Sequence, residues 1–315
     1  SISVGNITAG GTGKSPHIEY LIYLLQETKK IATLSRGYKR ESKGFFLANS
    51  NSNYKDIGDE PMQFHSKFKN INVAVDSDRR RGITKLQNDI APELILLDDC
   101  FQHRWIKPSL NIVLLEYSTI GDKQFMLPSG ELREWKSGIT RANIIVVSKS
   151  PHIYSPIEHR RITEIIGPKN HQEIFFSYID YQEIVPFNNT AKKLYEKDDF
   201  DLKELKVNVF AGIANIAPLI DHLKLKSKDV IHSKFKDHHS FQPADIIIVI
   251  NKFREIISSD KILITTEKDA MRLKDERIFP LLEEFPVFYL PIKVKFHKTN
   301  EGKLSFDQTI LDHVQ

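Results

Sequence analysis

The segment at residues 8–15, with the sequence Thr-Ala-Gly-Gly-Thr-Gly-Lys-Ser, constrains the fold of this chain more than any other feature. It follows an apolar run at residues 2–4 and precedes a stretch at 16–27 in which apolar residues recur every three or four positions. A glycine-rich loop that joins a strand to a helix and ends in Lys-Ser is the pattern of a phosphate-binding loop. Thr8 stands where the usual pattern has its first glycine. A chance glycine-rich turn is the alternative, and the strand–loop–helix order argues against it.

Each part of this loop has a predicted task. Glycine at positions 10, 11 and 13 lets backbone N–H groups curl around phosphate oxygens, and the N-terminus of the following helix adds a favourable dipole. Lys14 can reach the β- and γ-phosphates of a nucleotide, and the Ser15 hydroxyl can bind Mg²⁺. We predict that Lys14 is also a catalytic residue. The predicted nucleotide-binding residues are Thr8, Ala9, Gly10, Gly11, Thr12, Gly13, Lys14 and Ser15.

A second signal lies at residues 94–99, where four aliphatic residues are followed by Asp98 and Asp99. Aspartate is common in turns after strands, which is the structural interpretation. A phosphate-loop enzyme, however, needs a strand beside the loop that ends in an aspartate near Mg²⁺. The pair therefore predicts metal ligands together with Ser15, and the sequence leaves open which of the two aspartates binds the ion.

The choice between ATP and GTP depends on a guanine-binding motif, which the chain lacks. GTPases usually carry Asn-Lys-x-Asp after a late strand, and its aspartate reads guanine. The comparable position here is Ser148-Lys149-Ser150-Pro151, which has no aspartate. This difference favours ATP as the nucleotide.

The hydrophobic pattern predicts an α/β fold, a doubly wound and mostly parallel sheet with helices between the strands. Several candidate strands are continuous apolar runs, which is typical of parallel strands covered on both faces. We predict a phosphate-loop kinase core at 1–172 and a smaller α/β domain at 173–315. Strands at 175–181 and 287–295 flank the second domain and suggest a β-ribbon hinge. The predicted strands of the core are 2–4, 31–35, 71–75, 94–97, 112–116 and 144–148.

Composition narrows the class of protein. Apolar residues make up 40% of the chain and charged residues 27%, which indicates a globular protein with a normal core. The net charge of +4 suits anionic substrates or an anionic membrane surface, and it is too small to argue for nucleic acid. Cys100 is the single cysteine, so no internal disulfide can form and a reducing compartment is expected. The sequence has neither a signal peptide nor an apolar run of about 18 residues that would span a bilayer.

Some polar segments keep two interpretations on residue chemistry alone. Asp59 either begins a helix, with Pro61 in its first turn, or accepts a proton from an attacking hydroxyl. The basic stretch 36–40 is either a phosphate-facing loop or a plain turn. The segment 237–239, Asp-His-His, is a solvated turn, a metal site as in DHH phosphoesterases, or a site where a histidine orients a carboxylate. Arg133 can clamp an anion.

Together and in this order, these motifs resemble those of one family, the tetraacyldisaccharide 4′-kinases of lipid A synthesis. Thr8 in place of the first glycine of the loop is typical of that family. The resemblance extends from the first residues to about Arg272. The matching segments are 3–16, 35–38, 58–61, 98–103, 127–134, 212–215, 235–239 and 265–270.

The resemblance implies a kinase that uses ATP and Mg²⁺ to phosphorylate the 4′-hydroxyl of an acylated glucosamine disaccharide 1-phosphate. It also implies that Asp59 takes the hydroxyl proton and that His238 is its functional partner, so that both are catalytic residues. The alternatives are a phosphate-loop kinase for another small hydroxyl acceptor and a nucleotide-switch ATPase. The predicted substrate-binding residues are Arg36, Tyr38, Glu60, Gln102 and Arg133.

The resemblance further implies work at the cytoplasmic face of the inner membrane. Members of the family usually begin with a hydrophobic helix that associates with the membrane. This sequence opens directly on a strand without an initiator Met, so we expect a preceding segment with that role. Cys100 replaces a small residue that usually follows the acidic pair, a change that we expect to perturb little.

Overall fold

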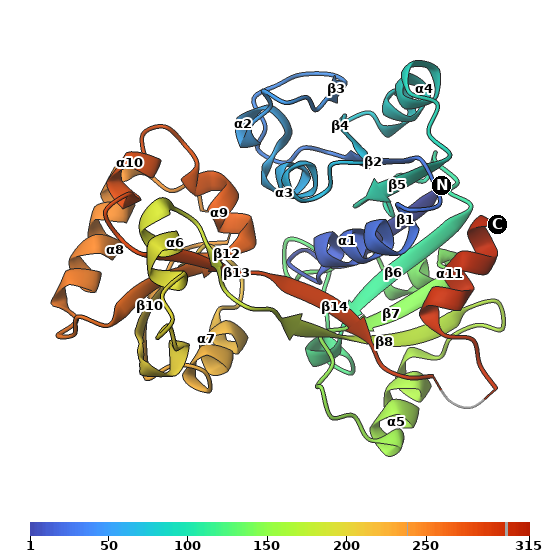
Figure 1. Cartoon of the computed structure of the whole chain (residues 1–315). Coiled ribbons are helices and arrows are strands. Elements are labelled where there is room, and N and C mark those ends of the chain that lie inside the picture. The colour runs from blue at the N-terminus through green and yellow to red at the C-terminus, as the bar shows by residue number, and fades with distance from the viewer. Residues whose placement is uncertain (238, 300–301) are drawn as a thin grey trace. The chain divides into compact units, whose positions relative to one another are not determined.

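The computed structural model describes residues 1–237, 239–299 and 302–315 (Figure 1). The chain forms two compact units. The first contains Ser1–Asp180 and Lys293–Gln315, and the second contains Tyr181–Ile292.

The first unit is built on a nine-stranded sheet with the order β14-β8-β7-β6-β1-β5-β2-β4-β3. Neighbouring strands from β4 to β8 pair in parallel, and the short edge strand β3 runs antiparallel to β4. The strand that leads into the phosphate loop, β1, therefore lies between β5 and β6. The strands are β1 (Ile2–Asn6), β2 (Ile31–Ser35), β3 (Phe46–Leu47), β4 (Asn72–Val75), β5 (Leu94–Asp98), β6 (Leu110–Glu116), β7 (Ile144–Ser148), β8 (Glu173–Tyr181) and β14 (Ile292–Phe296).

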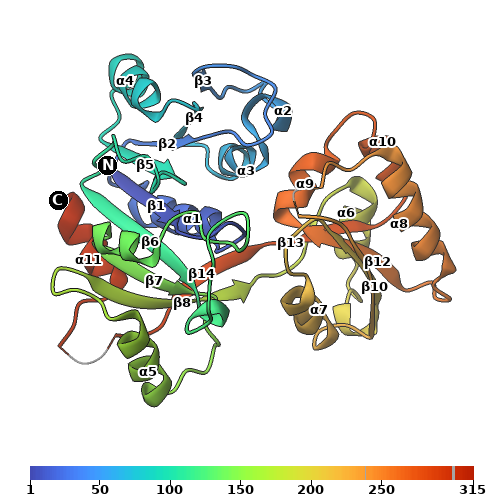
Figure 2. The ribbon, with the colours of Figure 1, turned by 180° about the vertical axis from the view of Figure 1, so that it is seen from behind.

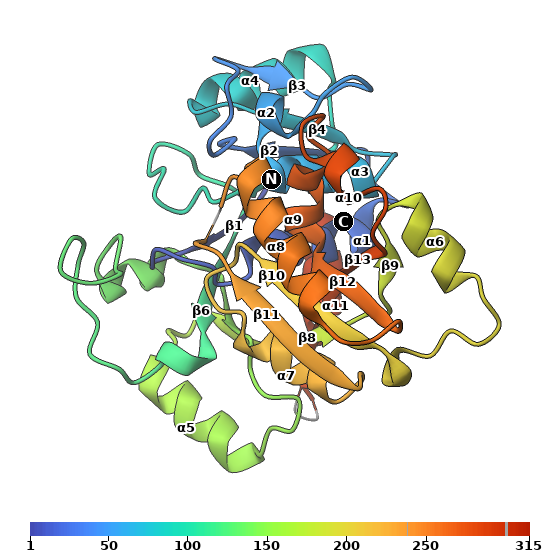
Figure 3. The ribbon, with the colours of Figure 1, turned by 90° about the vertical axis from the view of Figure 1, so that its left-hand side faces the viewer.

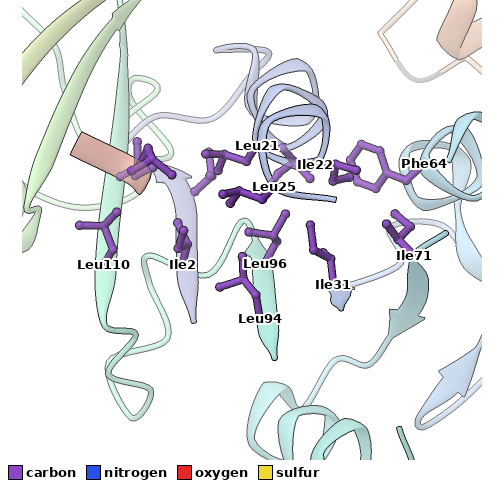
Figure 4. Packing of buried hydrophobic residues seen from close by; sticks show 14 of the residues in the cluster. Ile2, Leu21, Ile22, Leu25, Ile31, Phe64, Ile71, Leu94, Leu96 and Leu110 are labelled. Atoms are coloured by element: carbon purple, nitrogen blue, oxygen red, sulfur yellow. The ribbon is translucent and has the colours of Figure 1, made fainter. Parts of the chain in front are cut away.

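Helices cover both faces of this sheet, which Figure 2 shows from behind. On one face, Leu21, Ile22 and Leu25 of α1 pack over Ile2 and Leu96 (Figure 4). Alternate strand residues point to the opposite face, where a second cluster includes Ile95 and Leu97 of β5 and Leu86 of α4. The helices are α1 (Lys14–Leu25), α2 (Tyr54–Ile57), α3 (Asp59–Lys67), α4 (Arg79–Asp89), α5 (Pro156–Ile166) and α11 (Phe306–Val314), with 3₁₀ turns at Tyr117–Thr119 and Lys136–Arg141.

The second unit is a smaller α/β layer structure, seen in Figure 3. Its five-stranded sheet has the order β11-β10-β12-β13-β9, parallel except for the pair β13–β9. The strands are β9 (Val185–Pro186), β10 (Lys206–Ala211), β11 (Asp229–Lys234), β12 (Lys261–Thr266) and β13 (Val287–Leu290). The helices are α6 (Asn189–Tyr195), α7 (Ala217–Lys224), α8 (Pro243–Glu255), α9 (Glu267–Leu273) and α10 (Phe279–Leu282), with a 3₁₀ turn at Leu202–Glu204. Separate apolar clusters fill its two faces.

The predicted fold class is confirmed, a mixed α/β chain with a large, mostly parallel sheet. The division of the chain differs from the predicted boundary between 172 and 173. Residues 293–315 belong to the first unit because Phe306 and Ile310 of α11 are buried in its core. The predicted strand 287–295 is two strands, since β13 pairs with β12 in the second unit and β14 neighbours β8. A hinge role for β8 and β14 stays a prediction.

Within the described residues, no helix has the length and apolar character that crossing a membrane requires.

Candidate active site

The phosphate loop joins β1 to α1 and has the backbone of an anion site. Gly10 and Gly13 have φ values of 107° and 91°, in the left-handed region where a side chain is strained. A Cβ atom at Gly10 or Gly11 would meet nothing within 4 Å, so this side of the loop is open. Gly13 caps α1 without any side-chain hydrogen bond, and the first turn of α1 has no acidic residue. The positive end of the helix is thus available to phosphate oxygens.

Buried polar contacts hold the loop from beneath. Asn6 Nδ2 donates to Thr12 Oγ1 at 2.9 Å, and Ser148 Oγ donates to the Thr12 carbonyl at 2.8 Å. The Thr12 side chain is only 2% exposed. It therefore anchors the loop, and its predicted contact with a nucleotide stays a prediction.

A second segment runs along the loop. Thr8 and Leu132 form an isolated antiparallel bridge, and the Ala9 N–H donates to the Glu131 carbonyl at 2.6 Å. One step further, the Arg133 N–H donates to the Ile7 carbonyl at 2.8 Å. These bonds carry the predicted motif at 127–134 to the side of the phosphate loop.

The two aspartates at the end of β5 have different surroundings. Asp98 is 3% exposed, and its Oδ2 accepts a hydrogen bond from Ser35 Oγ at 3.2 Å. Its other oxygen, Oδ1, has no hydrogen-bond partner among the described residues. Asp99 has a left-handed backbone with φ of 50° and accepts two bonds from the Arg133 guanidinium, at 2.7 and 2.9 Å. Lys14 Nζ lies 3.8 Å from Asp99 Oδ1.

These surroundings move the pKa values of the two carboxyls in opposite directions. Burial, helped by the nearby charges of Glu60 and Asp99, raises the pKa of Asp98 to about 7. Burial also acts on Asp99, but the hydrogen bonds from Arg133 and the charge of Lys14 outweigh it and lower the pKa. Asp99 is thus a stable anion, whereas at Asp98 the charges of Lys14 and Arg79 do not offset the effect of burial.

The described residues include no cluster of three or more His, Cys, Asp or Glu side chains that could hold a metal. A site completed by phosphate oxygens and water does not require such a cluster, because Mg²⁺ usually keeps several waters and takes one or two carboxylates. The unpartnered Oδ1 of Asp98 fits such an ion. Ser15, 9% exposed in the first turn of α1, supplies a hydroxyl at the predicted position.

The structure brings two predicted motifs together at the start of α3. A Cβ atom at Gly58 would lie 3.1 Å from the carbonyl oxygen of Tyr38, so this glycine lets the two segments touch. Asp59 is the first residue of α3 and is 6% exposed. Asp59 therefore begins a helix, as one interpretation of the sequence predicted, and its role as proton acceptor stays a prediction. The negative charge of Glu60 raises the pKa of Asp98. The segment 58–61 is therefore close enough to the acidic pair to act on it electrostatically.

The remaining predicted substrate residues fall into two groups. Arg36 and Tyr38 are exposed, as a substrate contact requires. Gln102 and Arg133 are held by hydrogen bonds within the chain, and their contact with a substrate stays a prediction. Gln102 Nε2 donates to the Asn6 carbonyl and to Glu134, both at 2.8 Å. Arg133, besides its bonds to Asp99, donates to the backbone and side chain of Asn6.

Several residues of the site carried no sequence signal of their own. Arg79 is 1% exposed and donates to the carbonyl oxygens of Asp76 at 2.7 Å and Asp98 at 3.3 Å. In the sequence it is one of three consecutive arginines, and nothing distinguishes the buried one. Asn6 and Ser35 lie inside matched motifs, yet the polar ends of strands are too common to suggest a role.

Outside this site, Cys100 is buried, and burial raises the pKa of its thiol to about 11, as expected for a packing residue. In the second unit, Thr266 caps α9, because its Oγ1 accepts a hydrogen bond from the Asp269 N–H at 3.1 Å. His239 contacts Asp245 at 2.8 Å. His238, the predicted partner of Asp59, lies outside the described residues.

Comparison with known proteins gives one consistent result. A sequence profile described as "Tetraacyldisaccharide-1-P 4'-kinase" matches residues 1–313. The tetraacyldisaccharide 4′-kinase of Flavobacterium johnsoniae is 42% identical over 321 residues, an alignment that covers 100% of this chain and 87% of the relative. The same enzyme of Parabacteroides distasonis is 42% identical over 317 residues, covering 99% and 85%. The crystal structure of LpxK from Aquifex aeolicus in complex with ATP matches with a TM-score of 0.68 and 27% identity, covering 100% of this chain and 88% of that one.

Proposed function

The chain belongs to the tetraacyldisaccharide-1-P 4′-kinase family, and on that premise we propose that it transfers the γ-phosphoryl group of ATP to the 4′-hydroxyl of tetraacyldisaccharide 1-phosphate. One structural observation carries the proposal. The open, uncapped phosphate loop lies beside the acidic pair, with Lys14 Nζ 3.8 Å from Asp99. This combination is suited to phosphoryl transfer, in which catalysis is mostly positioning and charge stabilisation.

ATP binds in this proposal with its phosphates on the loop. The left-handed backbone at Gly10 and Gly13 would let N–H groups of the loop face the phosphates, and Lys14 would leave Asp99 to contact the β- and γ-phosphates. Arg133 keeps its bidentate bond to Asp99, so the aspartate stays neutralised when Lys14 moves. The ATP complex of the Aquifex aeolicus protein supports the choice of nucleotide.

Mg²⁺ is the proposed metal, and Ser15 with Asp98 or Asp99 would hold it. When bound, the ion neutralises charge that develops on the phosphate oxygens. Asp98 is the stronger candidate because one of its oxygens has no partner in the described chain. Asp99 already shares both oxygens with Arg133.

Asp59 is the proposed acceptor of the proton from the 4′-hydroxyl. It is a nearly buried carboxylate at the N-terminus of α3, and Gly58 before it lies against the backbone of Tyr38. A base within hydrogen-bond reach of the attacking hydroxyl raises the rate because it takes the proton in the transition state. The role of His238 as its partner rests on the family resemblance.

The acceptor also suggests where the enzyme works. A disaccharide with several acyl chains resides in a bilayer, and ATP is supplied from the cytosol. We therefore propose that the chain works at the cytoplasmic face of the inner membrane and meets the lipid at the membrane surface. The mild positive charge of +4 is compatible with an anionic surface.

The direct test is transfer of label from [γ-³²P]ATP to three samples: detergent-dispersed tetraacyldisaccharide 1-phosphate, soluble glucosamine, and no acceptor. We expect a labelled lipid product and little label elsewhere. Transfer to the soluble sugar at a comparable rate would favour a small-acceptor kinase. Slow hydrolysis that no acceptor stimulates would favour a nucleotide switch.

A further inference from the structure

His17 is a buried polar residue that the proposed reaction does not use. It lies in the first turn of α1, three residues after Lys14, and its side chain is 3% exposed. Both ring nitrogens have partners. Nδ1 is 2.7 Å from the carbonyl oxygen of Gly13, and Nε2 is 2.9 Å from Ser177 Oγ on β8. Ser177 is itself only 1% exposed, so water does not compete for these bonds.

The chemistry of the partners determines the protonation of the ring. A carbonyl oxygen can only accept, so Nδ1 must carry the hydrogen that joins it to Gly13. The Ser177 hydroxyl can then donate to the lone pair of Nε2. Both bonds are within the normal range for hydrogen bonds, and together they fix the ring against rotation.

The Gly13 carbonyl also accepts the backbone N–H of His17 at 3.2 Å, the first bond of the α1 ladder. Two donors of one residue therefore hold this oxygen toward the body of the helix. In a trans peptide the C=O and the following N–H point in opposite directions. The orientation of the Gly13 carbonyl therefore determines that the Lys14 N–H points out of the helix, toward the open side of the loop.

We propose that His17 is a positioning residue for nucleotide binding, because it locks the Gly13–Lys14 peptide and so aims the Lys14 N–H at a bound phosphate. Ser177 is its support, since it holds the ring from the β8 side. This inference rests on the proposed binding of ATP at the loop. It assigns a role to a strand residue far from the loop in sequence.

Peptide locking matters here because Gly13 sits in the left-handed region, with φ of 91° and ψ of 25°. Glycine reaches many other conformations at little cost. With the 3.2 Å backbone bond from His17 alone, the peptide after Gly13 could rotate more readily and turn the Lys14 N–H away from the phosphate. The bond from His17 Nδ1 to the Gly13 carbonyl, at 2.7 Å, opposes that rotation.

Two amide substitutions separate the two bonds of the ring. In His17→Asn the side-chain nitrogen stands at the δ position and can still donate to Gly13. In His17→Gln it stands at the ε position, where it can reach Ser177 and not Gly13. Calorimetric titration of Mg²⁺-ATP into each purified protein measures the consequence, and steady-state assays measure KM for ATP and for the lipid.

We expect His17→Asn to bind ATP within about twofold of the unsubstituted protein. His17→Gln should bind ATP about threefold to tenfold more weakly, the loss expected for one neutral hydrogen bond. The KM for the lipid acceptor should stay unchanged in both variants. Equal ATP affinities in the two variants, or weaker binding by His17→Asn, would overturn the proposal. So would a loss of thermal stability without any change in ATP affinity, because that is the result of a purely structural role.

Two further variants complete the test. Ser177→Ala breaks the same bond as His17→Asn and leaves the bond to Gly13, so it should also bind ATP within about twofold of the unsubstituted protein. If His17→Asn does not fold, Ser177→Ala takes its place beside His17→Gln, and equal ATP affinities in those two variants would overturn the proposal. His159→Gln, on α5, is the matched control for a half-buried histidine and should bind ATP normally. Failure of the unsubstituted protein to bind ATP would overturn the proposed function as well, whereas the other adverse results concern His17 alone.

Discussion

Lys14 Nζ lies 3.8 Å from Asp99 Oδ1, so the cation of the phosphate loop rests on the end of the neighbouring strand β5. Both side chains are partly exposed, at 15% and 34%, and Arg133 binds the same carboxylate at 2.7 Å. The contact is therefore a weak ion pair between groups that water can reach. Lys14 can leave it for a phosphate at little cost.

This geometry predicts the effect of Lys14→Ala. Phosphoryl transfer should fall by at least about 100-fold, because a positioned charge on the transferring group is lost. The melting temperature should change little, since the ion pair with Asp99 is weak. A radiometric assay and thermal denaturation measure the two quantities. Lys85→Ala, an exposed change on α4, is the control, and normal turnover by Lys14→Ala would refute the phosphate-loop assignment.

The two aspartates can be distinguished through metal dependence. We expect Asp98→Asn to lose most of the gain in ATP affinity that Mg²⁺ provides, because Asp98 has the oxygen without a partner. Asp99→Asn should keep more of that gain, since Asp99 is bound to Arg133. ATP titrations with and without Mg²⁺ give the comparison. The reverse order would assign the metal to Asp99.

Asp59→Asn should lower kcat by about 100-fold to 10,000-fold, the usual contribution of a general base. The KM for ATP should change little, because the proposed role of Asp59 concerns the acceptor hydroxyl. Steady-state kinetics with the lipid acceptor provide the measurement. If the variant kept its rate per folded molecule and lost only thermal stability, Asp59 would be a helix-terminus residue and no base.

His159 predicts a pH dependence of stability. It packs on Phe176 with ring centroids 4.4 Å apart and on Tyr154 at 6.0 Å. Burial, with a smaller effect from the charge of Lys303, lowers the pKa of His159. The unfolded chain therefore binds a proton more readily than the folded one, and the free energy of unfolding falls as the pH drops below about 6.5.

The substitution His159→Gln should reduce this loss of stability in acid. Urea denaturation at pH 7.5, 6.5 and 5.5 would show the difference between the two proteins narrowing toward low pH. A difference that is the same at every pH would mean that His159 does not titrate between these values. Activity at pH 7.5 should be normal, because the residue lies on α5, away from the phosphate loop.

Much of the first unit was predictable from sequence because its signals are local. The strands 31–35 and 144–148 coincide with β2 and β7, since a continuous apolar run is what a strand buried on both faces requires. The boundary of the units was not predictable in this way. The apolar residues of α11 indicate an amphipathic helix, and nothing in their spacing says which core receives them.

The candidate site also has one part that local sequence predicts and another that depends on tertiary structure. Glycines, Lys14 and Ser15 stand in fixed order within one loop, so the sequence alone determined the phosphate-binding element and its strand–loop–helix setting. Tertiary structure decided that Arg133 bonds to Asp99, that Gln102 bonds to the Asn6 carbonyl, and that Ser177 lies within hydrogen-bond distance of His17. The physical reason is distance along the chain. Neighbouring residues specify the backbone conformation of a loop and the spacing of apolar residues along a helix or strand. A hydrogen bond between remote segments depends on how the sheet brings their strands together.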